Sequence, residues 1–201
     1  MKAIILLNGE PHRGEIDASF ARVYCCDGAY RWANGKVRID ETLGDFDSLD
    51  VLPDPPPSVI YPSEKNLTDG EIAIKRAVEA GATEIEIYGG GGGREDHFLG
   101  NLHLLYLAHQ MGANAVMITN GARIRIACGK TVVQAKKGAT LSIIPFGRDA
   151  HIIESSGLYY PLQDLWLRYG STRGISNVME GNEASFVSEG VVLVIINEEV
   201  V

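Results

Sequence analysis

The sequence is poor in cysteine, has no long hydrophobic run and shows no excess of basic residues. Its three cysteines, Cys25, Cys26 and Cys128, are odd in number and lack zinc-site spacing. This excludes a disulfide framework and indicates a reducing, cytoplasmic location. No apolar stretch approaches the roughly 20 residues of a membrane span. The first residues also lack the long apolar core and cleavage site of a signal peptide, so we expect no membrane association.

Composition and charge narrow the class of protein further. Of the 201 residues, 45% are hydrophobic and 22% are charged, which is typical of one large globular domain or two small ones. Lys and Arg total 18 against 26 Asp and Glu, so the formal net charge is −8. A nucleic-acid-binding protein usually presents a basic face, and we therefore expect no nucleic acid partner. A nucleotide stays compatible with this balance, because a metal ion offsets acidic side chains.

The first half of the chain alternates short apolar runs with helical patterns. The candidate strands are Ala3–Leu7, Arg22–Cys26, Val59–Tyr61, Glu84–Tyr88 and Ala115–Thr119. The candidate helices are Asp69–Ala80 and Glu95–Met111. Gly81 and Gly112 come directly after them, at the position where glycine readily ends a helix. This alternation predicts an α/β fold with a mainly parallel sheet and helices on both faces.

The pattern changes near residue 121, and no long amphipathic helix follows. Gly129-Lys130 separates two β-rich runs and predicts a hairpin, and Glu189-Gly190 predicts another. The β-rich runs are Ile124–Ala127, Thr131–Ala135, Thr140–Ile144, Ser185–Ser188 and Val191–Ile196. We therefore expect an α/β domain over residues 1–121 and an all-β domain over residues 122–201.

Two segments of the first half carry carboxylates at positions suited to a metal ion. In Gly44–Ser48, Asp45 and Asp47 are spaced i and i+2 and can supply oxygen ligands to Mg²⁺. Taken alone, this segment is better explained as an ordinary turn. Further on, Thr68 and Glu71 fit a helix capping box, which places Asp69 at the start of a helix and beside a loop edge.

Five consecutive glycines, Gly89–Gly93, link a predicted strand to a predicted helix. Backbone without side chains can approach a polyphosphate, and the start of the following helix offers free N–H groups. Arg94 can hold phosphate oxygens in a forked arrangement. We prefer this interpretation to a flexible turn, because ordering five glycines is entropically costly.

A fourth candidate region lies in the expected β domain. Ser155–Leu162 and Gly174–Asn177 combine aromatic surface with small polar groups, and could hold a flat heterocycle. By composition alone a set of β-turns explains them better.

Taken together, these segments resemble the thiamine pyrophosphokinase family. The resemblance spans nearly the whole chain and depends on the order and spacing of the motifs rather than on any single one. The matching segments are Cys26–Ala29, Gly44–Ser48, Lys65–Asp69, Gly92–His97 with Asn101, Ser142–Pro145, Gly157–Leu162 and Ser176-Asn177.

The resemblance implies a fold, an assembly and a reaction. It implies an N-terminal α/β ATP-binding domain, a C-terminal β-sandwich that binds thiamine, and a homodimer. The implied reaction transfers diphosphate from ATP to the thiamine hydroxyl and leaves AMP.

The resemblance also implies roles for particular residues. Asp45, Asp47 and Asp69 would hold Mg²⁺, and Asp96 would join them in catalysis. Residues expected beside ATP are Asp27, Lys65, Asn66, Thr68, Gly92, Gly93, Arg94 and Asn101. Residues expected beside thiamine are Tyr160, Ser176 and Asn177. As a base for the thiamine hydroxyl we consider Asp47 or Asp96.

Two departures from the family pattern bear on these roles. Where the family usually has Asp after the lysine, this chain has Asn66, which keeps a carbonyl oxygen and loses a charge. Gly90 and Gly91 replace small residues of other kinds. Asn66 favours an alternative in which the chain is a thiamine- or nucleotide-binding regulatory module with weakened catalysis. A further alternative is a diphosphokinase acting on another small alcohol, such as a pterin.

Overall fold

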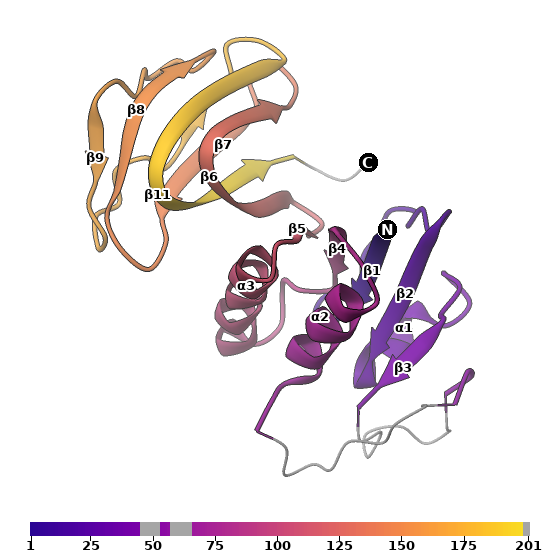
Figure 1. Cartoon of the computed structure of the whole chain (residues 1–201). Coiled ribbons are helices and arrows are strands. Elements are labelled where there is room, and N and C mark those ends of the chain that lie inside the picture. Colours follow the sequence, from indigo (N-terminus) through magenta and orange to yellow (C-terminus); the bar gives the residue numbers. More distant parts are fainter. Residues whose placement is uncertain (45–52, 57–65, 199–201) are drawn as a thin grey trace. The chain divides into compact units, whose positions relative to one another are not determined.

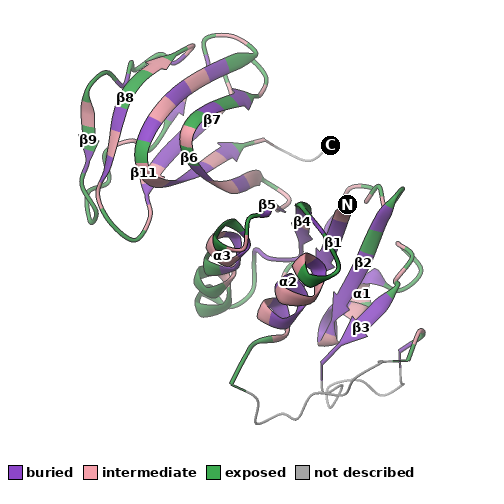
Figure 2. Cartoon of the chain, in the orientation of Figure 1, coloured by how far each residue is buried: buried purple, intermediate pink, exposed green. Residues whose placement is uncertain are grey.

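The computed structural model describes residues 1–44, 53–56 and 66–198. The chain divides into an N-terminal unit, Met1–Asn120, and a C-terminal unit, Gly121–Glu199 (Figure 1). The fold is mixed α/β and is dominated by strands, with few helices. Buried residues concentrate in the strands of both units (Figure 2). No helix in the described ranges has the length and apolar character needed to cross a bilayer.

The N-terminal unit is built on a parallel sheet in the order β5-β4-β1-β2-β3. Its strands are β1 (Lys2–Leu6), β2 (Ala21–Cys26), β3 (Glu41–Leu43), β4 (Glu84–Tyr88) and β5 (Asn114–Ile118). The apolar runs of the sequence predicted all of these except β3, whose three residues are too few to show a pattern. The predicted strand Val59–Tyr61 lies outside the described residues.

Helices lie on both faces of this sheet. Ile4 and Leu6 of β1 share one face with a buried cluster that includes Ala29 and Ala33, from the short helices η1 (Asp27–Ala29) and α1 (Tyr30–Ala33). Side chains alternate along a strand, so the residues between them face the other way. There α2 (Asp69–Glu79) packs against β1 and β2, and α3 (Glu95–Gln110) against β5. In Figure 1, α2 and α3 lie in front of the sheet and α1 behind it.

The ends of α2 and α3 follow the sequence signals. The Thr68 side chain accepts a hydrogen bond from Glu71 N at 3.2 Å, which confirms the predicted cap of α2. Gly81 and Gly112, after α2 and α3, have φ of +91° and +82°, the left-handed conformation that ends a helix. Both helices end within one residue of the predicted position.

The strand order creates a switch point between β1 and β4. From β1 the chain passes to β2 and β3 on one side, and it then returns to place β4 and β5 on the other side of β1. The connections after β1 and after β4 therefore leave toward opposite faces. In open parallel sheets, ligands bind at the carboxyl ends of the strands beside such a point.

The described residues of the C-terminal unit form antiparallel strands and no helix. The strands are β6 (Ala122–Gln134), β7 (Thr140–Pro145), β8 (Ala150–Ser156), β9 (Leu165–Leu167), β10 (Asn177–Val178) and β11 (Glu183–Asn197). One row runs β10-β7-β11-β6, and a second runs β6-β11-β8-β9. Buried residues from both rows, including Leu141, Ile152 and Phe186, form one hydrophobic cluster.

The two predicted hairpins are wrong. Both β6 and β11 run through the glycine signals as continuous strands, with a register shift between Ser188 and Val192. Gly129, opposite Ser188, and Gly190 have φ of +76° and +95°. Glycine at such positions permits a bulge and a bend as readily as a turn. Before the bulge β11 pairs with β8, and after it with β7, so one strand serves both rows.

Candidate functional site

The loops after β1 and β4 lie side by side at the carboxyl edge of the N-terminal sheet. We call residues 8–13 the β1 segment and Gly89–Gly93 the glycine loop. Gly9 N donates to Gly89 O at 2.8 Å, and Glu10 N donates to Gly91 O at 2.7 Å. A Cβ at Gly9 would lie 2.4 Å from Gly89 O, so only glycine allows this approach. The switch point is therefore lined by two loops that hold each other in place.

Most of the glycine loop is packed against protein. A Cβ at Gly89 would lie 2.1 Å from Leu7 O, and Gly90, Gly91 and Gly92 would each meet another atom of the protein at 2.8 Å or less. Gly93 differs, because it has φ +73° and nothing within 4 Å of its would-be Cβ. Packing thus accounts for the first four glycines. The open approach expected for a polyphosphate applies to the Gly93 end of the loop.

Asn101, expected beside ATP, reaches the glycine loop from α3. Its Nδ2 donates to Gly90 O at 2.9 Å, and the side chain is partly buried. Through this hydrogen bond α3 fixes the loop that precedes it.

Arg94 and Asp96 pair with each other at the start of α3. The Arg94 guanidinium donates to both Asp96 oxygens, at 3.1 Å from Nε and 2.6 Å from Nη2. Asp96 Oδ1 also accepts from His97 N at 2.9 Å. Hydrogen bonds from Arg94 hold the pKa of Asp96 below its usual range, and the pair raises the pKa of Arg94. Asp96 is therefore ionised and a weak base, and Arg94 has to exchange a carboxylate for any phosphate it binds.

Asp27 and Gly44 bring the ends of β2 and β3 together. Asp27 directly follows β2, and a Cβ at Gly44 would lie 2.8 Å from Asp27 Cβ. The Gly44–Ser48 motif thus begins beside Asp27. Its two aspartates, Asp45 and Asp47, lie outside the described residues, as does Lys65.

Asp69 is the first residue of α2, whose first turn packs against Leu7 and Leu104. A Cβ at Gly70 would lie 2.7 Å from Leu104 Cδ1 and 3.2 Å from Leu7 Cδ2, and Leu7 directly follows β1. Asn66 and Thr68 are exposed just before the helix. Asp69 therefore belongs to the same carboxyl edge as Asp27 and Gly44.

Carboxylate oxygens at this edge suit a hard cation such as Mg²⁺. Across residues 1–44, 53–56 and 66–198, no three His, Cys, Asp or Glu side chains form a metal-binding group. The expected trio of Asp45, Asp47 and Asp69 extends beyond those ranges, so its convergence stays a prediction.

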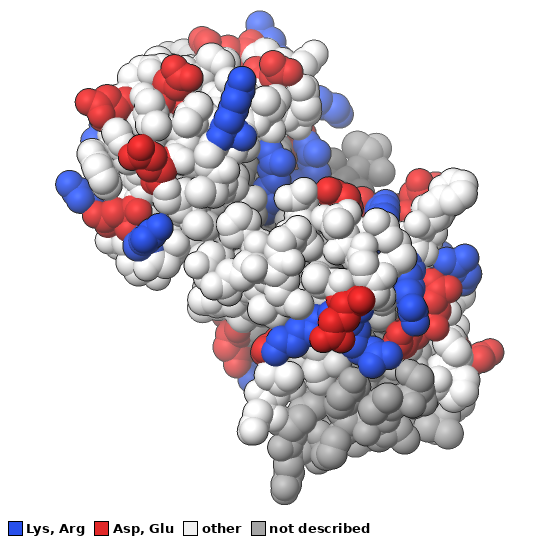
Figure 3. Space-filling view, viewed as in Figure 1, with Lys and Arg blue, Asp and Glu red and all other residues white. Residues whose placement is uncertain are grey.

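Other carboxylates of the N-terminal unit are committed to ion pairs. Buried Glu41 pairs with Arg22 at 3.0 Å and also with Arg76, while Glu71 pairs with Lys75 at 2.8 Å. In Figure 3 acidic and basic side chains are interspersed on the visible face of this unit. Glu41 begins β3, so it lies at the opposite edge of the sheet from Asp27 and Asp69.

In the C-terminal unit the structure brings the three expected thiamine residues together. Asn177 is only 3% exposed; its Oδ1 accepts from Tyr160 N at 3.0 Å and its Nδ2 donates to Tyr160 O at 2.7 Å. Ser176 has φ +61°, and its N donates to Ser142 Oγ at 3.1 Å. The Asn177 amide thus holds the Tyr160 backbone, while the Tyr160 ring and the Ser176 side chain stay exposed.

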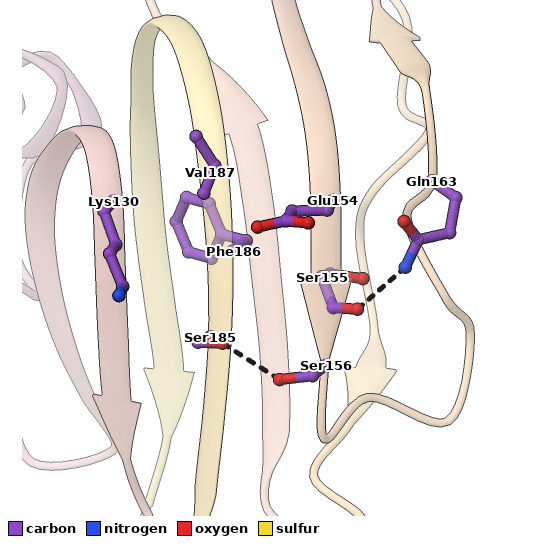
Figure 4. Close-up of a pocket in the computed structure, with 8 residues that line it drawn as sticks. All are labelled: Lys130, Glu154, Ser155, Ser156, Gln163, Ser185, Phe186 and Val187. Atoms are coloured by element: carbon purple, nitrogen blue, oxygen red, sulfur yellow. Dashed lines mark hydrogen bonds between the residues drawn. The ribbon is translucent and has the colours of Figure 1, made fainter.

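A separate recess of about 220 Å³ lies on β6, β11 and β8 (Figure 4). Val187 pairs with Lys130 on one side and Glu154 on the other. The hydroxyls of Ser156 and Ser185 are 2.9 Å apart at one end. Ser155 and Ser156, from the candidate region Ser155–Leu162, line this recess, whereas Tyr160, Ser176 and Asn177 do not.

Sequence reasoning missed His12 and Asn120, which both contribute to the carboxyl edge. His12 is buried, with its ring 4.8 Å from that of Tyr88, and burial lowers its pKa. Asn120 follows β5 and hydrogen-bonds the β1 segment. The available signal was position, because each residue comes shortly after a predicted strand of a parallel sheet.

Comparison with known proteins matches both units. Residues 16–117 match the family model "Thiamin pyrophosphokinase, catalytic domain", and residues 126–193 match "Thiamin pyrophosphokinase, vitamin B1 binding domain". The thiamine pyrophosphokinase of Bacillus subtilis is 32% identical over 164 residues, which is 77% of each chain.

Solved structures agree over the full length. The crystal structure of the Bacillus subtilis enzyme superposes with a TM-score of 0.83 at 26% identity and covers 99% of each chain. That of thiamin pyrophosphokinase from Geobacillus thermodenitrificans gives 0.81 at 26% identity, covering 99% of this chain and 98% of the other. On these matches, and with the carboxyl-edge loops and the Tyr160–Asn177 surface in place, the chain belongs to the thiamine pyrophosphokinase family.

Proposed function

We propose that this chain transfers the diphosphate of ATP to the hydroxyl of thiamine, giving thiamine diphosphate and AMP. The observation that carries this proposal is the pair of family matches, catalytic then vitamin-binding, which fall in chain order on the two units. The polar loops at the switch point of the N-terminal sheet support it.

We assign ATP to the carboxyl edge of the N-terminal unit. Gly93 and the first N–H groups of α3 offer an open approach to phosphate oxygens. Arg94 would leave Asp96 and bind phosphate in the same forked manner. Asp45, Asp47 and Asp69 would hold Mg²⁺, which supplies positive charge to offset the phosphate oxygens.

We assign thiamine to the exposed surface around Tyr160 and Ser176 in the C-terminal β-sandwich. The Tyr160 ring, 59% exposed, offers a stacking face, and Tyr159 packs edge-on against it at 4.8 Å. Ser176 offers a hydroxyl next to the Asn177 anchor. The family resemblance adds a homodimer to this proposal, and the few, unpatterned cysteines favour a cytoplasmic location.

In the reaction the thiamine hydroxyl oxygen bonds to the β-phosphorus of ATP. The bond from that phosphorus to the oxygen bridging it to the α-phosphorus breaks, and AMP leaves with the bonding electrons. A carboxylate accepts the hydroxyl proton. Asp47 and Asp96 are the candidates for this carboxylate. Positioning and electrostatics supply most of the acceleration, as in phosphoryl transfer generally.

The direct test incubates the chain with ATP, Mg²⁺ and thiamine and separates the products by chromatography. Equal amounts of AMP and thiamine diphosphate are expected. ADP in place of AMP would contradict transfer of an intact diphosphate. A pterin alcohol in place of thiamine tests the alternative acceptor, and no product is expected from it.

Asn66 favours a second candidate, a binding module with weakened catalysis. A neutral amide in place of a carboxylate attracts a divalent cation less strongly. This candidate predicts that ATP and thiamine both bind, by calorimetry, while no AMP forms. Under it, Asn66→Asp restores turnover; under the enzymatic proposal, Asn66→Asp changes a rate that is already measurable.

A further inference from the structure

The end of β5 contacts both loops of the switch point. A Cβ at Gly91 would lie 2.8 Å from Thr119 Cγ2, so this part of the glycine loop rests on Thr119. The next residue, Asn120, bonds the β1 segment twice. Its Oδ1 accepts from Arg13 N at 2.9 Å, and its Nδ2 donates to Pro11 O at 3.1 Å.

The bonds to Arg13 and Pro11 connect residues that are 107 and 109 positions apart in the sequence. His12 lies between these two partners. His12 is 5% exposed and lies edge-on to Tyr88, the last residue of β4. The β1 segment is thus held by the packing of His12 against Tyr88 and by two hydrogen bonds with Asn120. The segment also hydrogen-bonds the glycine loop through Gly9 N and Glu10 N, and its Asn8 lies against Gly28.

We infer that Asn120 is a positioning residue for ATP: it fixes the β1 segment, which in turn fixes the glycine loop that faces the phosphates. This inference rests on the proposed function. Asn120 bonds Pro11 and Arg13. In the same segment, Glu10 N bonds Gly91 O. A Cβ built at Gly92 would lie 2.6 Å from Glu10 Cβ, so Gly92 also packs against Glu10. Loss of the Asn120 side chain should release the β1 segment and loosen the glycine loop beside Gly93. Every group that faces ATP would still be present.

The N-terminal end of the same strand provides a matched control. Asn114 begins β5, and its Nδ2 donates to Glu84 Oε1 at 3.0 Å, at the sheet edge away from the site. Asn114→Ala removes an asparagine side chain and its amide hydrogen bond at one end of β5, and Asn120→Ala does so just beyond the other end. It leaves the β1 segment and the glycine loop untouched.

The test measures steady-state rates for wild type, Asn120→Ala, Asn120→Asp and Asn114→Ala. We expect Asn120→Ala to raise KM for ATP about tenfold, the size of effect expected from one net hydrogen bond, and to leave KM for thiamine unchanged. Asn120→Asp keeps the acceptor for Arg13 N and loses the donor to Pro11 O, so it should fall between. Asn114→Ala should match wild type.

Two readouts do not depend on turnover. Calorimetry with α,β-methylene-ATP and Mg²⁺ measures nucleotide affinity without reaction. In this analogue a methylene group replaces the oxygen between the α- and β-phosphorus atoms, so AMP cannot leave. Hydrogen exchange at the Gly9 and Glu10 amides reports whether the β1 segment has been released, and it should quicken in Asn120→Ala only. Far-ultraviolet circular dichroism shows that each variant is folded, with Asn120→Asp available should Asn120→Ala fail to fold.

The outcomes separate this inference from the proposed function. Unchanged affinity for α,β-methylene-ATP in both Asn120 variants overturns it, as does an equal loss of thiamine affinity. If the wild type binds the analogue but releases no AMP from ATP, the proposed function alone is overturned. The affinities of the variants for the analogue then still decide the role of Asn120. A wild type that binds no nucleotide overturns both.

Discussion

The two units present their candidate groups in different ways. At the N-terminal edge the groups lie on loops after parallel strands, and backbone contacts such as Gly9 N to Gly89 O fix their positions. In the C-terminal unit one buried side chain, Asn177, holds the Tyr160 loop with hydrogen bonds at both its ends. In the first arrangement a functional side chain can change without loss of the loop. In the second, the anchor and the surface it supports fail together.

This contrast is informative because it separates chemistry from support. Phosphate and Mg²⁺ are recognised by backbone N–H groups and carboxylates, which need open loops and a charged edge. A flat heterocycle is recognised by a fixed ring and hydroxyl, which need a rigid base. The predictions below test whether activity and stability separate in the N-terminal unit and stay coupled in the C-terminal one.

The largest effect is expected for Asp69→Asn. Loss of a charge at the edge where Mg²⁺ and phosphates meet should lower kcat by about 100-fold or more. Asparagine at the first turn of α2 forfeits the favourable interaction of a carboxylate with the helix dipole, so unfolding free energy should fall by about 1 kcal/mol. Thermal unfolding and AMP release measure the two. Glu79→Gln, exposed at the other end of α2, is the control and should change neither. Full turnover in Asp69→Asn would remove Asp69 from the site.

Asn177→Ala should couple stability to substrate binding. It leaves the Tyr160 backbone groups and Val178 N without the bonds they now make, which costs about 2 to 3 kcal/mol. The Tyr160 loop should shift, so KM for thiamine should rise about tenfold while KM for ATP stays constant.

Asn182→Ala is the control for this coupling. Asn182 is exposed, and its Oδ1 accepts one bond from Lys137 N at 3.1 Å. It should cost less than about 1 kcal/mol and leave both KM values alone. A destabilised Asn177→Ala that keeps its thiamine KM would show that Asn177 supports the fold and not the thiamine surface.

A smaller effect should follow from Gly93→Ala. Gly93 and Gly112 both have positive φ and open space around a would-be Cβ, at opposite ends of α3. Alanine at either position should therefore cost a similar 1 to 2 kcal/mol, about the price of a left-handed residue. Only Gly93→Ala should raise KM for ATP, by about fivefold. Equal KM values for the two variants would indicate that phosphate does not approach Gly93.

Sequence patterns predicted the parts of this molecule that depend on local chemistry. Thr68 with Glu71, and Gly81 and Gly112, marked helix ends because a cap or a left-handed residue acts within one turn. Gly129 and Gly190 misled, because a bulge and a hairpin require the same backbone freedom and only strand pairing distinguishes them.

The candidate site shows the same limit. The reason for glycine at position 89 is Leu7 O, and the anchor for Tyr160 is Asn177, both distant in sequence. Position after a parallel strand identified the right edge of the sheet. It gave no means of telling that Asn101 holds Gly90 O, or that Asn120 holds the β1 segment.

The smallest effect should come from two exposed ion pairs, one in each unit. Asp96 bonds Arg94, and Asp149 bonds Arg168 Nη1 at 2.7 Å; in each case the hydrogen bond from arginine lowers the pKa of the carboxyl. A carboxyl whose pKa is lower in the folded state adds stability above its unfolded pKa, about 3.9, and loses it as pH falls through the folded value. Asp96→Asn and Asp149→Asn should therefore lower Tm slightly and equally at pH 7, and converge with wild type in strong acid. A Tm difference that persists in strong acid would show that the aspartates act through packing and not through charge.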